Sequence, residues 1–420
     1  MDKFVIEGGH SLSGEISVSG AKNAALPIMA ATILWPDRYV LTNVPYLRDT
    51  LTMARLMGLI GARLSFQNNR MEIDTTNCDK TEAPYELVKT MRASFYVLGP
   101  LLARFGRCRV SLPGGCNWGP RPVDLHLKAL QLLGADISLE EGYIIGRGRL
   151  KGAAIHFETS SVGATGNALM AAVRAEGETV ITNAAREPEI TALAHFLQAL
   201  GAQIEGIGTT TLIIVGQPEL HGAEYAIIPD RIEAATFLIA GALLGDGLKI
   251  TGAREDHVAA VLNHLKAAGA LIRQTDGSLE ISRPASLIPV DIVTQPYPGY
   301  PTDLQAQWIV LMSQAEGTSA IRDTIYSDRF THVPELVRLG AMIKVEGNQA
   351  LVAGPTPLIG APVMSTDIRA SAALLLAALA ARGSTEISRV YHIDRGYEAI
   401  EKKFSALGAR IERIRGEIQA

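Results

Sequence analysis

Six stretches of the chain repeat the same order of hydrophobic and polar positions. In each stretch an amphipathic helical pattern ends at a Gly-Ala pair, and alternating apolar residues typical of a strand follow it. The pairs are Gly61-Ala62, Gly134-Ala135, Gly201-Ala202, Gly269-Ala270, Gly340-Ala341 and Gly408-Ala409, with spacings of 73, 67, 68, 71 and 68 residues. Such regularity indicates internal repeats. A glycine at this place fits the end of a helix, where the backbone turns left-handed.

Each amphipathic helix is preceded by a predicted strand, and each strand by a second helix that is almost wholly apolar. The strands are expected at 39–44, 108–112, 179–183, 248–251, 319–322 and 385–388. The apolar helices are expected at 24–34, 93–102, 167–173, 234–244, 304–312 and 370–380. A helix that is apolar all round is buried on every side. Six such units therefore predict helices enclosed within sheets and exclude a single open sheet.

The sixth repeat is incomplete, because the chain ends soon after Gly408-Ala409. The segment Phe4–Gly9, followed by Leu12–Ile16, resembles the hairpin ends of the other repeats, such as Leu212–Gly216. We therefore expect the amino-terminal strand to complete the last repeat. Equal division of the repeats predicts one domain at residues 22–229 and a second, discontinuous domain at 1–21 and 230–420.

Composition limits the function classes that remain. The chain has 420 residues, 47% hydrophobic and 20% charged, which suits a globular protein with two or three domains. A net charge of −4 gives no general attraction to nucleic acid or to anionic membranes. The longest wholly apolar stretch, Ala372–Ala381, is too short to span a bilayer, and residues 1–7 show no signal pattern. Three cysteines, an odd number, favour a reducing compartment, so a cytoplasmic protein is expected.

The apolar helices begin with polar residues, most of them cationic. These are Lys22 and Asn23, Arg92, Ser161–Gly163, Arg231, Asp303 and Arg369. A cation at a helix amino terminus opposes the helix dipole by about 0.3–1 kcal/mol, so an anion is expected to join it. A second series of arginines follows the strands: Arg48, Arg121, Arg186, Arg254, Arg329 and Arg395.

The simpler interpretation of the second series is local pairing. Each of these arginines has a carboxylate close to it in the chain: Asp49, Asp124, Glu187, Glu255, Asp328 and Asp394. Against this, equivalent positions in repeated units converge on the same end of a domain. Arginine forks and helix amino termini both bind carboxylate and phosphate groups. The pattern therefore predicts a site for a substrate with several negative charges.

Two further residues are candidates for chemistry. Cys116 lies in a loop rich in glycine and proline, between Arg109 and Arg121, where cations would stabilise a thiolate or a nearby anion. Asp303 is a lone carboxylate at the start of an apolar helix, where it would serve either as a helix cap or as a base. No His/Cys spacing indicates zinc, and no Walker loop or GxGxxG motif follows a strand. No metal or cofactor is expected.

Several longer motifs carry a resemblance to a known family. They are Gly20–Pro27, Pro113–Cys116 with Gly119–His126, Ser161–Asn167, Ala185–Ile190, Pro301–Gln307 and Asp394–Glu398. Together they resemble the UDP-N-acetylglucosamine 1-carboxyvinyltransferases, which are enolpyruvyl transferases, and the match runs essentially from end to end. The resemblance implies a two-domain inside-out α/β barrel of six βαβαββ-type repeats, with pseudo-threefold symmetry in each domain. It also implies a role in peptidoglycan biosynthesis.

The resemblance implies the following site residues. Lys22, Arg121 and Arg395 would bind the phosphate of phosphoenolpyruvate, with Arg329 and Arg369 near its carboxylate and Asn23 beside both substrates. UDP-N-acetylglucosamine would be held by Asn23, Arg92, Arg121, Pro122, Val123, Asp124, Leu125, Ser161, Val162, Gly163, Asp303 and Ile325. Phosphoenolpyruvate and this nucleotide sugar are the expected partners, with no nucleic acid and no membrane.

The implied reaction is an addition followed by an elimination. The 3-hydroxyl of the sugar attacks C2 of phosphoenolpyruvate while C3 is protonated, and phosphate then leaves. Asp303 is the expected base and Cys116 the expected acid, with Lys22 and Arg395 also in the catalytic set. Neighbouring arginines lower the pKa of the thiol, and an incoming phosphate would raise it again. We therefore expect a partly ionised Cys116 that regains its proton with substrate and that an epoxide phosphonate such as fosfomycin alkylates.

Alternatives remain open from the sequence. Enolpyruvyl transfer to shikimate 3-phosphate or to another uridine nucleotide would use the same repeats. An RNA 3′-phosphate cyclase has related repeats, although it would call for a broad basic surface. A non-catalytic repeat scaffold is a third class, against which Lys22, Cys116, Asp303 and Arg395 together speak.

Overall fold

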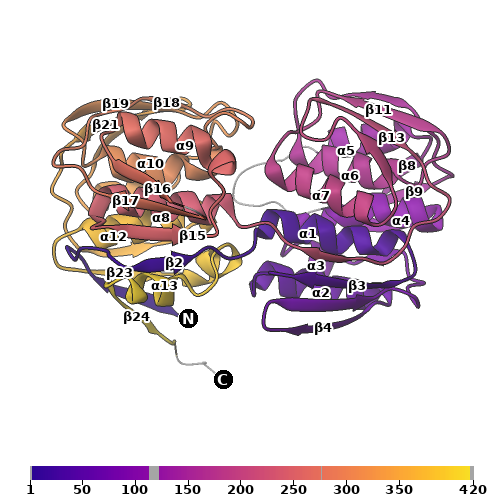
Figure 1. Cartoon of the computed structure of the whole chain (residues 1–420), viewed down its shortest axis with the longest axis horizontal. Helices are drawn as coiled ribbons and strands as arrows, with labels where there is room; N and C mark the ends of the chain where they lie inside the picture. Colours follow the sequence, from indigo (N-terminus) through magenta and orange to yellow (C-terminus); the bar gives the residue numbers. More distant parts are fainter. Residues whose placement is uncertain (1, 113–122, 276, 417–420) are drawn as a thin grey trace. The chain divides into compact units, whose positions relative to one another are not determined.

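The chain folds into two units of similar size (Figure 1). The computed structural model describes residues 2–112, 123–275 and 277–416. Unit 1 consists of Met1–Ser19 and Pro229–Ala420, and unit 2 of Gly20–Ile228. The chain therefore passes from one unit to the other twice, after residues 19 and 228. Each unit is described below by itself.

Each unit contains three four-stranded sheets, and all six sheets share one strand order. A short strand pairs parallel with a central strand, which pairs antiparallel with a third strand, and a fourth strand forms the other edge. In five sheets the third and fourth strands form a hairpin, and in the sixth they come from the two ends of the chain. In unit 2 the sheets are β14 (Glu224–Ala226), β3 (Arg38–Thr42), β5 (Arg70–Asp74), β4 (Arg63–Gln67); β6 (Glu82–Ala83), β7 (Arg107–Ser111), β9 (Tyr143–Arg147), β8 (Asp136–Glu140); and β10 (Ala154–His156), β11 (Glu178–Thr182), β13 (Thr211–Val215), β12 (Gln203–Glu205).

The sheets of unit 1 repeat this arrangement. They are β2 (Glu15–Ser17), β15 (Leu248–Thr251), β17 (Ser278–Ser282), β16 (Leu271–Thr275); β18 (Ile292–Val293), β19 (Gly317–Arg322), β21 (Gln349–Gly354), β20 (Met342–Glu346); and β22 (Pro362–Met364), β23 (Ser384–Ser388), β1 (Lys3–Glu7), β24 (Arg410–Ile414). The six predicted central strands are confirmed to within two residues at either end. Their identical surroundings confirm the six repeats.

The apolar helices lie inside the units, as their composition requires. In unit 2 they are α1 (Lys22–Ala31) with η1 (Thr32–Leu34), η2 (Arg92–Val97) with α4 (Leu98–Phe105), and α6 (Val162–Ala172). In unit 1 they are α8 (Arg231–Leu244), η3 (Thr302–Leu304) with α10 (Gln305–Met312), and α12 (Ile368–Ala380). The helix expected at 93–102 is split at Leu98, because Pro100 has no N–H to continue a longer helix but fits a first turn.

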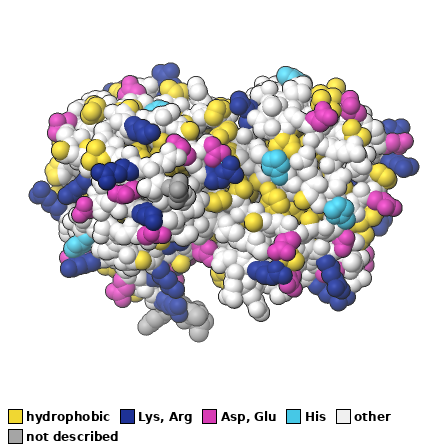
Figure 2. All heavy atoms as spheres, in the orientation of Figure 1, with side chains coloured by type: hydrophobic (Ala, Val, Ile, Leu, Met, Phe, Trp, Pro, Cys, Tyr) yellow, Lys and Arg dark blue, Asp and Glu magenta, His cyan; other side chains and the backbone are white. Residues whose placement is uncertain are grey.

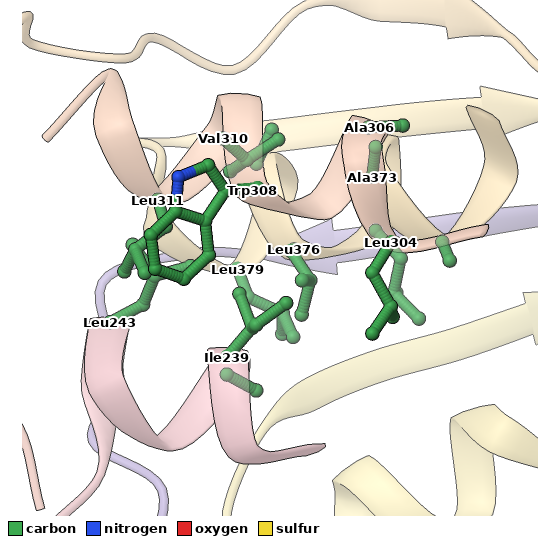
Figure 3. Packing of buried hydrophobic residues seen from close by; sticks show 14 of the residues in the cluster. Ile239, Leu243, Leu304, Ala306, Trp308, Val310, Leu311, Ala373, Leu376 and Leu379 are labelled. Carbon is green, nitrogen blue, oxygen red and sulfur yellow. The ribbon is translucent and has the colours of Figure 1, made fainter. Parts of the chain in front are cut away.

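The core of unit 1 forms where its three apolar helices pack on one another. Trp308 of α10 is fully buried against Leu243 of α8 and Leu379 of α12 (Figure 3). Its indole N–H donates to the carbonyl of Val290 at 3.2 Å, so burial leaves no polar group of the ring unpaired. A cluster of the same kind fills unit 2.

The amphipathic helices all end in the same way. They are α2 (Arg48–Ile60), α5 (Asp124–Leu132), α7 (Pro188–Ala199), α9 (Glu255–Ala267), α11 (Val333–Arg338) and α13 (Ile400–Ala406). The six glycines that follow them have φ between +93° and +111°, and the alanine N–H after each donates to the carbonyl five residues earlier at 3.0 Å. This is the Schellman arrangement, which favours glycine in the left-handed position. The structure thus confirms the meaning of the Gly-Ala signature.

Two strands complete sheets whose other strands lie far away in the sequence. β1 lies between β23 and β24, so the amino-terminal strand completes the last repeat, as predicted. β14, which comes after the third repeat, pairs with β3 and completes the first one. The sequence analysis missed this second closure, because a three-residue edge strand carries too short a pattern to recognise. The remaining short elements are α3 (Tyr85–Val88) and η4 (Val390–Arg395).

The surface carries mixed charge. Figure 2 shows Lys and Arg side chains interspersed with Asp and Glu over the face in view. No helix among the described residues is long and apolar enough to cross a membrane.

Replacing Ile6 by alanine tests the discontinuous unit. Ile6 is fully buried in the central position of its sheet, whereas the neighbouring Val5 is only partly buried. We expect Ile6→Ala to lower the free energy of unfolding of unit 1 by about 2–4 kcal/mol, because the cavity forms inside the core. Val5→Ala is the control, with a smaller loss. Equal, small effects in a denaturant titration would show that the amino-terminal strand is dispensable.

Candidate functional site

Lys22 begins α1 of unit 2 and has a buried acidic partner. Its Nζ lies 3.3 Å from Oδ2 of Asp49, which stands in the first turn of α2, and both side chains are less than a tenth exposed. This carboxylate balances a cation that would otherwise oppose the dipole of α1. Asn23 follows as the second residue of α1, and Arg92 begins η2; both are partly exposed.

The amino terminus of α6 is built around a small residue and a buried ring. Ser161 caps the helix, its Oγ accepting from the N–H of Ala164 at 3.3 Å, and Val162 and Gly163 form the first turn. A Cβ at Gly163 would lie 2.8 Å from Cε1 of His126, so only glycine lets the ring approach this closely. His126 follows Val123, Asp124 and Leu125 at the start of α5. The ring thereby brings two sequence-predicted segments of the site together.

A buried network holds His126 in place. The Asn167 amide nitrogen lies 3.0 Å from His126 Nδ1 and donates to the carbonyl of Phe95, while its oxygen accepts from the N–H of Gly99 at 2.9 Å. Because the amide donates to it, Nδ1 is an acceptor and the imidazole is neutral. Burial and the charge of Arg92 lower the pKa of His126 to about 3. The sequence analysis missed Asn167, because it lies in an otherwise apolar helix.

In unit 1 a carboxylate lies between two arginines. Oδ1 of Asp303 is 2.8 Å from Nη2 of Arg329, and Oδ2 is 3.1 Å from Nη2 of Arg369. Both arginine side chains are buried, and a quarter of the Asp303 side chain remains exposed. Burial by itself would raise the pKa of Asp303, but the charges and hydrogen bonds of Arg369 and Arg329 outweigh it and hold the pKa below its usual range. The structure therefore confirms that an anion joins the cation at the start of α12.

Further polar groups support this cluster. Nη1 of Arg329 donates to Oγ1 of Thr302 at 2.9 Å, and that hydroxyl donates to Asp323 at 2.7 Å. Arg369 lies 3.4 Å from the hydroxyl of Tyr397, which is 3.0 Å from Thr236 Oγ1 on α8. These contacts join separate elements of unit 1 behind the two arginines. The sequence did not predict Thr236 and Thr302 as part of this cluster, because threonines are common and only the structure shows which groups their hydroxyls contact.

The remaining predicted residues of unit 1 lie near this cluster in the chain. Ile325 is exposed, and its N–H donates to Asp323 Oδ1 at 3.0 Å. Arg395 ends η4 and is partly exposed. The neighbouring Asp394 pairs with Arg413 at 2.6 Å, and Arg254 pairs with Asp256 rather than with Glu255. The predicted pairing of Arg254 with Glu255, its nearest carboxylate in the chain, is therefore wrong.

Three predicted site residues, Cys116, Arg121 and Pro122, lie outside the described residues. The other two cysteines, Cys78 and Cys108, are buried and free, and burial raises their pKa to about 11 and about 12. Within the described ranges no group of three or more His, Cys, Asp or Glu side chains is placed to hold a metal ion.

Comparison with known proteins identifies the family. The sequence model of EPSP synthase (3-phosphoshikimate 1-carboxyvinyltransferase) matches residues 6–404. The chain belongs to the EPSP synthase family. It is 55% identical over 417 residues to a UDP-N-acetylglucosamine 1-carboxyvinyltransferase of Chlorobaculum parvum, and 56% identical to one of Prosthecochloris aestuarii, covering 98% of each chain.

Solved structures agree with the family. The enolpyruvyl transferase NikO of Streptomyces tendae is similar with a TM-score of 0.90 at 28% identity, over 98% of both chains. EPSP synthase of Acinetobacter baumannii has a TM-score of 0.75 at 18% identity, covering 99% of this chain and all of that one, and shares the fold. The predicted two-domain fold of enolpyruvyl transferases is confirmed.

The buried histidines make stability depend on pH. His332 of unit 1 is, like His126, held neutral, because burial and the charge of Arg329 lower its pKa to about 3. An unfolded imidazole binds its proton near pH 6.5, so between about pH 6.5 and 3 the unfolded state binds more protons. The stability that each neutral histidine provides is therefore present above pH 6.5 and lost as the pH falls.

Acid titration of a variant tests this for unit 2. We expect the unfolding free energy of His126→Gln to fall less steeply with decreasing pH, by up to about 1.4 kcal/mol per pH unit. The control is His195→Gln, which replaces an exposed histidine of α7 and keeps the wild-type slope. Denaturant titrations from pH 7 to 4 measure the slopes. Parallel curves for His126→Gln and wild type would contradict the neutral, buried imidazole.

Proposed function

We propose that the chain transfers the enolpyruvyl group of phosphoenolpyruvate to the 3-hydroxyl of UDP-N-acetylglucosamine and releases phosphate. This is the first committed step of peptidoglycan biosynthesis. The observation that carries the proposal is the placement of Asp303 between Arg329 and Arg369, at the start of a buried helix. The choice of acceptor rests on relatives of that printed name, 54–56% identical over 98% of the chain.

The arginine pair suits the carboxylate of phosphoenolpyruvate. Each guanidinium already binds one carboxylate oxygen in a charge-assisted hydrogen bond, and both guanidinium groups are buried. A substrate carboxylate that binds Arg329 and Arg369 competes with Asp303 for the same donors. As the arginines turn toward the substrate, the pKa of Asp303 rises toward its ordinary range. The base is thus activated by the substrate that it serves.

The steps of the reaction balance in atoms and charge. Asp303 takes the proton of the 3-hydroxyl as the oxygen forms its bond to C2, and C3 gains a proton, for which we propose the Cys116 thiol. In the elimination the Cys116 thiolate is proposed to take a proton back from C3. The double bond forms again as the C2–O bond to phosphate breaks, and the leaving phosphate takes the proton held by Asp303. Lys22, Arg121 and Arg395 are proposed to bind the phosphate, whose negative charge cationic groups stabilise. The reaction needs no cofactor.

Most of the residues proposed to hold the nucleotide sugar belong to unit 2, whereas Asp303 and Ile325 belong to unit 1. The start of α6, with Ser161, Val162 and Gly163, offers backbone N–H groups and the positive end of a helix dipole. The start of α5, from Val123 to Leu125, approaches α6 through His126. Arg92, Arg121, Pro122, Asn23, Asp303 and Ile325 complete the proposed set. We also propose a cytoplasmic location, which rests on the odd number of cysteines.

An acceptor assay tests the function. Phosphate release is measured with phosphoenolpyruvate and either UDP-N-acetylglucosamine or shikimate 3-phosphate. We expect release only with the nucleotide sugar, together with a product carrying the enolpyruvyl group in mass spectrometry. Release only with shikimate 3-phosphate would assign the chain to the other acceptor. No release with any acceptor would favour the non-catalytic scaffold.

Asp303→Asn tests the proposed base. We expect kcat to fall by about 10²–10⁴-fold, because the amide accepts no proton, while KM for phosphoenolpyruvate stays level or decreases. The reason is that Arg329 and Arg369 then lose a competing carboxylate. The control is Asp328→Asn, which removes the same charge at the exposed residue before Arg329 in the chain. We expect it to leave kcat and KM unchanged. A rise in KM with kcat unchanged would assign Asp303 to binding alone.

A further inference from the structure

The far end of unit 2 contains a cationic cavity of about 440 Å³. It lies where the apolar helices end, at Leu102 and Arg104 of α4 and at Arg174, two residues beyond α6. The proposed substrate residue Ser161 caps the opposite end of α6. Eleven residues of helix at 1.5 Å each separate the two ends by about 16 Å. The cavity is therefore separate from the proposed active site.

Three arginines line this cavity, and no acidic residue of the described part of the chain does. They are Arg104, Arg149 and Arg174, and the other seven lining residues are apolar, glycine, proline or glutamine. The carboxylate that acts on Arg174 is Glu219, which is exposed and does not line the cavity. Three like charges that share a cavity of this size repel one another unless an anion binds between them.

Helix capping accounts for only part of this cluster. Arg104 donates to the carbonyls of Ile33, Thr75 and Cys78 at 3.0–3.3 Å. The bond to Ile33, in η1, is the ordinary role of a cation near a helix end, whereas Thr75 and Cys78 lie in the loop after β5. Arg174 donates one N–H to the carbonyl of Pro218 at 2.6 Å and lies 4.7 Å from the ring centroid of Trp35.

Two observations go beyond capping. Nε of Arg174 is buried and has no hydrogen-bond partner among the described residues. The side chain of Arg149, in the link between β9 and β10, makes no hydrogen bond to a helix end among the described residues. Burial also lowers the pKa of both Arg104 and Arg174, and their mutual repulsion contributes at Arg174. A bound anion would offset this repulsion.

We propose that Arg104, Arg149 and Arg174 form a second anion site of unit 2, for a small phosphorylated molecule with two or more negative charges. Guanidinium forks bind phosphate oxygens in pairs, and a volume of about 440 Å³ lies within the range of small-molecule sites. The exposed Arg149 stands at the entrance, while the partly buried Arg104 and Arg174 form the inner wall.

Calorimetry on the full chain tests the site, with pyrophosphate as the probe at low ionic strength. Saturating UDP-N-acetylglucosamine and fosfomycin are present throughout, to occupy the proposed sites of the nucleotide sugar and of phosphoenolpyruvate. We expect one saturable binding event in the wild type and binding about tenfold or more weaker in Arg149→Ala, because a charge-assisted contact is lost. Arg147→Ala is the matched control, since Arg147 is exposed at the end of β9, outside the cavity lining.

The outcomes distinguish specific binding in the cavity from non-specific attraction of the anion to positive charge. Unchanged affinity in Arg147→Ala supports the site, whereas equal weakening in both variants, or no saturation in the wild type, would overturn it. Trp35 supplies an independent signal: its fluorescence should change on binding, and the change should be absent in Trp35→Phe. A second arm with adenosine diphosphate distinguishes the source of the phosphate, because tighter binding than pyrophosphate indicates a nucleotide and equal binding an inorganic ligand.

Discussion

Complete burial of helices is the constraint on which this structure depends. α8 and α12 carry alanine, leucine and isoleucine around almost their whole circumference, so neither can rest on one face of an open sheet. Three sheets around three helices bury every side. The same constraint explains the repeats, since each sheet has to supply an equivalent wall. It also explains why β1 and β14 come from distant parts of the chain: each completes one of the sheets that surround the helices of its unit.

Enclosure also decides where charge can lie. The middle of an apolar helix has no room for an ion, so charged groups gather at the helix ends. In unit 1 this places Arg369 at the start of α12, where Asp303 and Asp367 meet it. In unit 2 it places Lys22 beside Asp49 at one end of the helices and Arg104 with Arg174 at the other. The charged side chains therefore lie at the ends of the apolar helices, whereas the middle of each helix contributes only apolar packing.

The Asp303 cluster illustrates how a stabilising contact serves a reaction. Two buried arginines with no acidic partner would leave unit 1 with uncompensated charge, so Asp303 has a structural role before any substrate arrives. Its lowered pKa makes it a weak base in that state. In the proposed reaction, a carboxylate-bearing substrate would replace Asp303 on the arginines, which keeps their charge balanced and frees Asp303 to accept a proton.

The sequence by itself determined the repeats, the strands and the enclosed helices, because these depend on periodicity and on glycine at a left-handed helix end, and its longer motifs indicated the family. It also named Lys22, Asp303 and Arg369, since charge at the start of an apolar helix is visible in one dimension, and Arg329 as one of the arginines that follow the strands. Only the tertiary structure decided which charges meet: Arg329 lies 26 positions from Asp303 and Arg369 lies 66. Likewise Asn167, His126 and Gly163 became a group only once α5 and α6 had packed together. The local pattern of a segment shows which of its faces is buried. Which side chains meet across the fold depends on the packing of distant segments, which no local pattern contains.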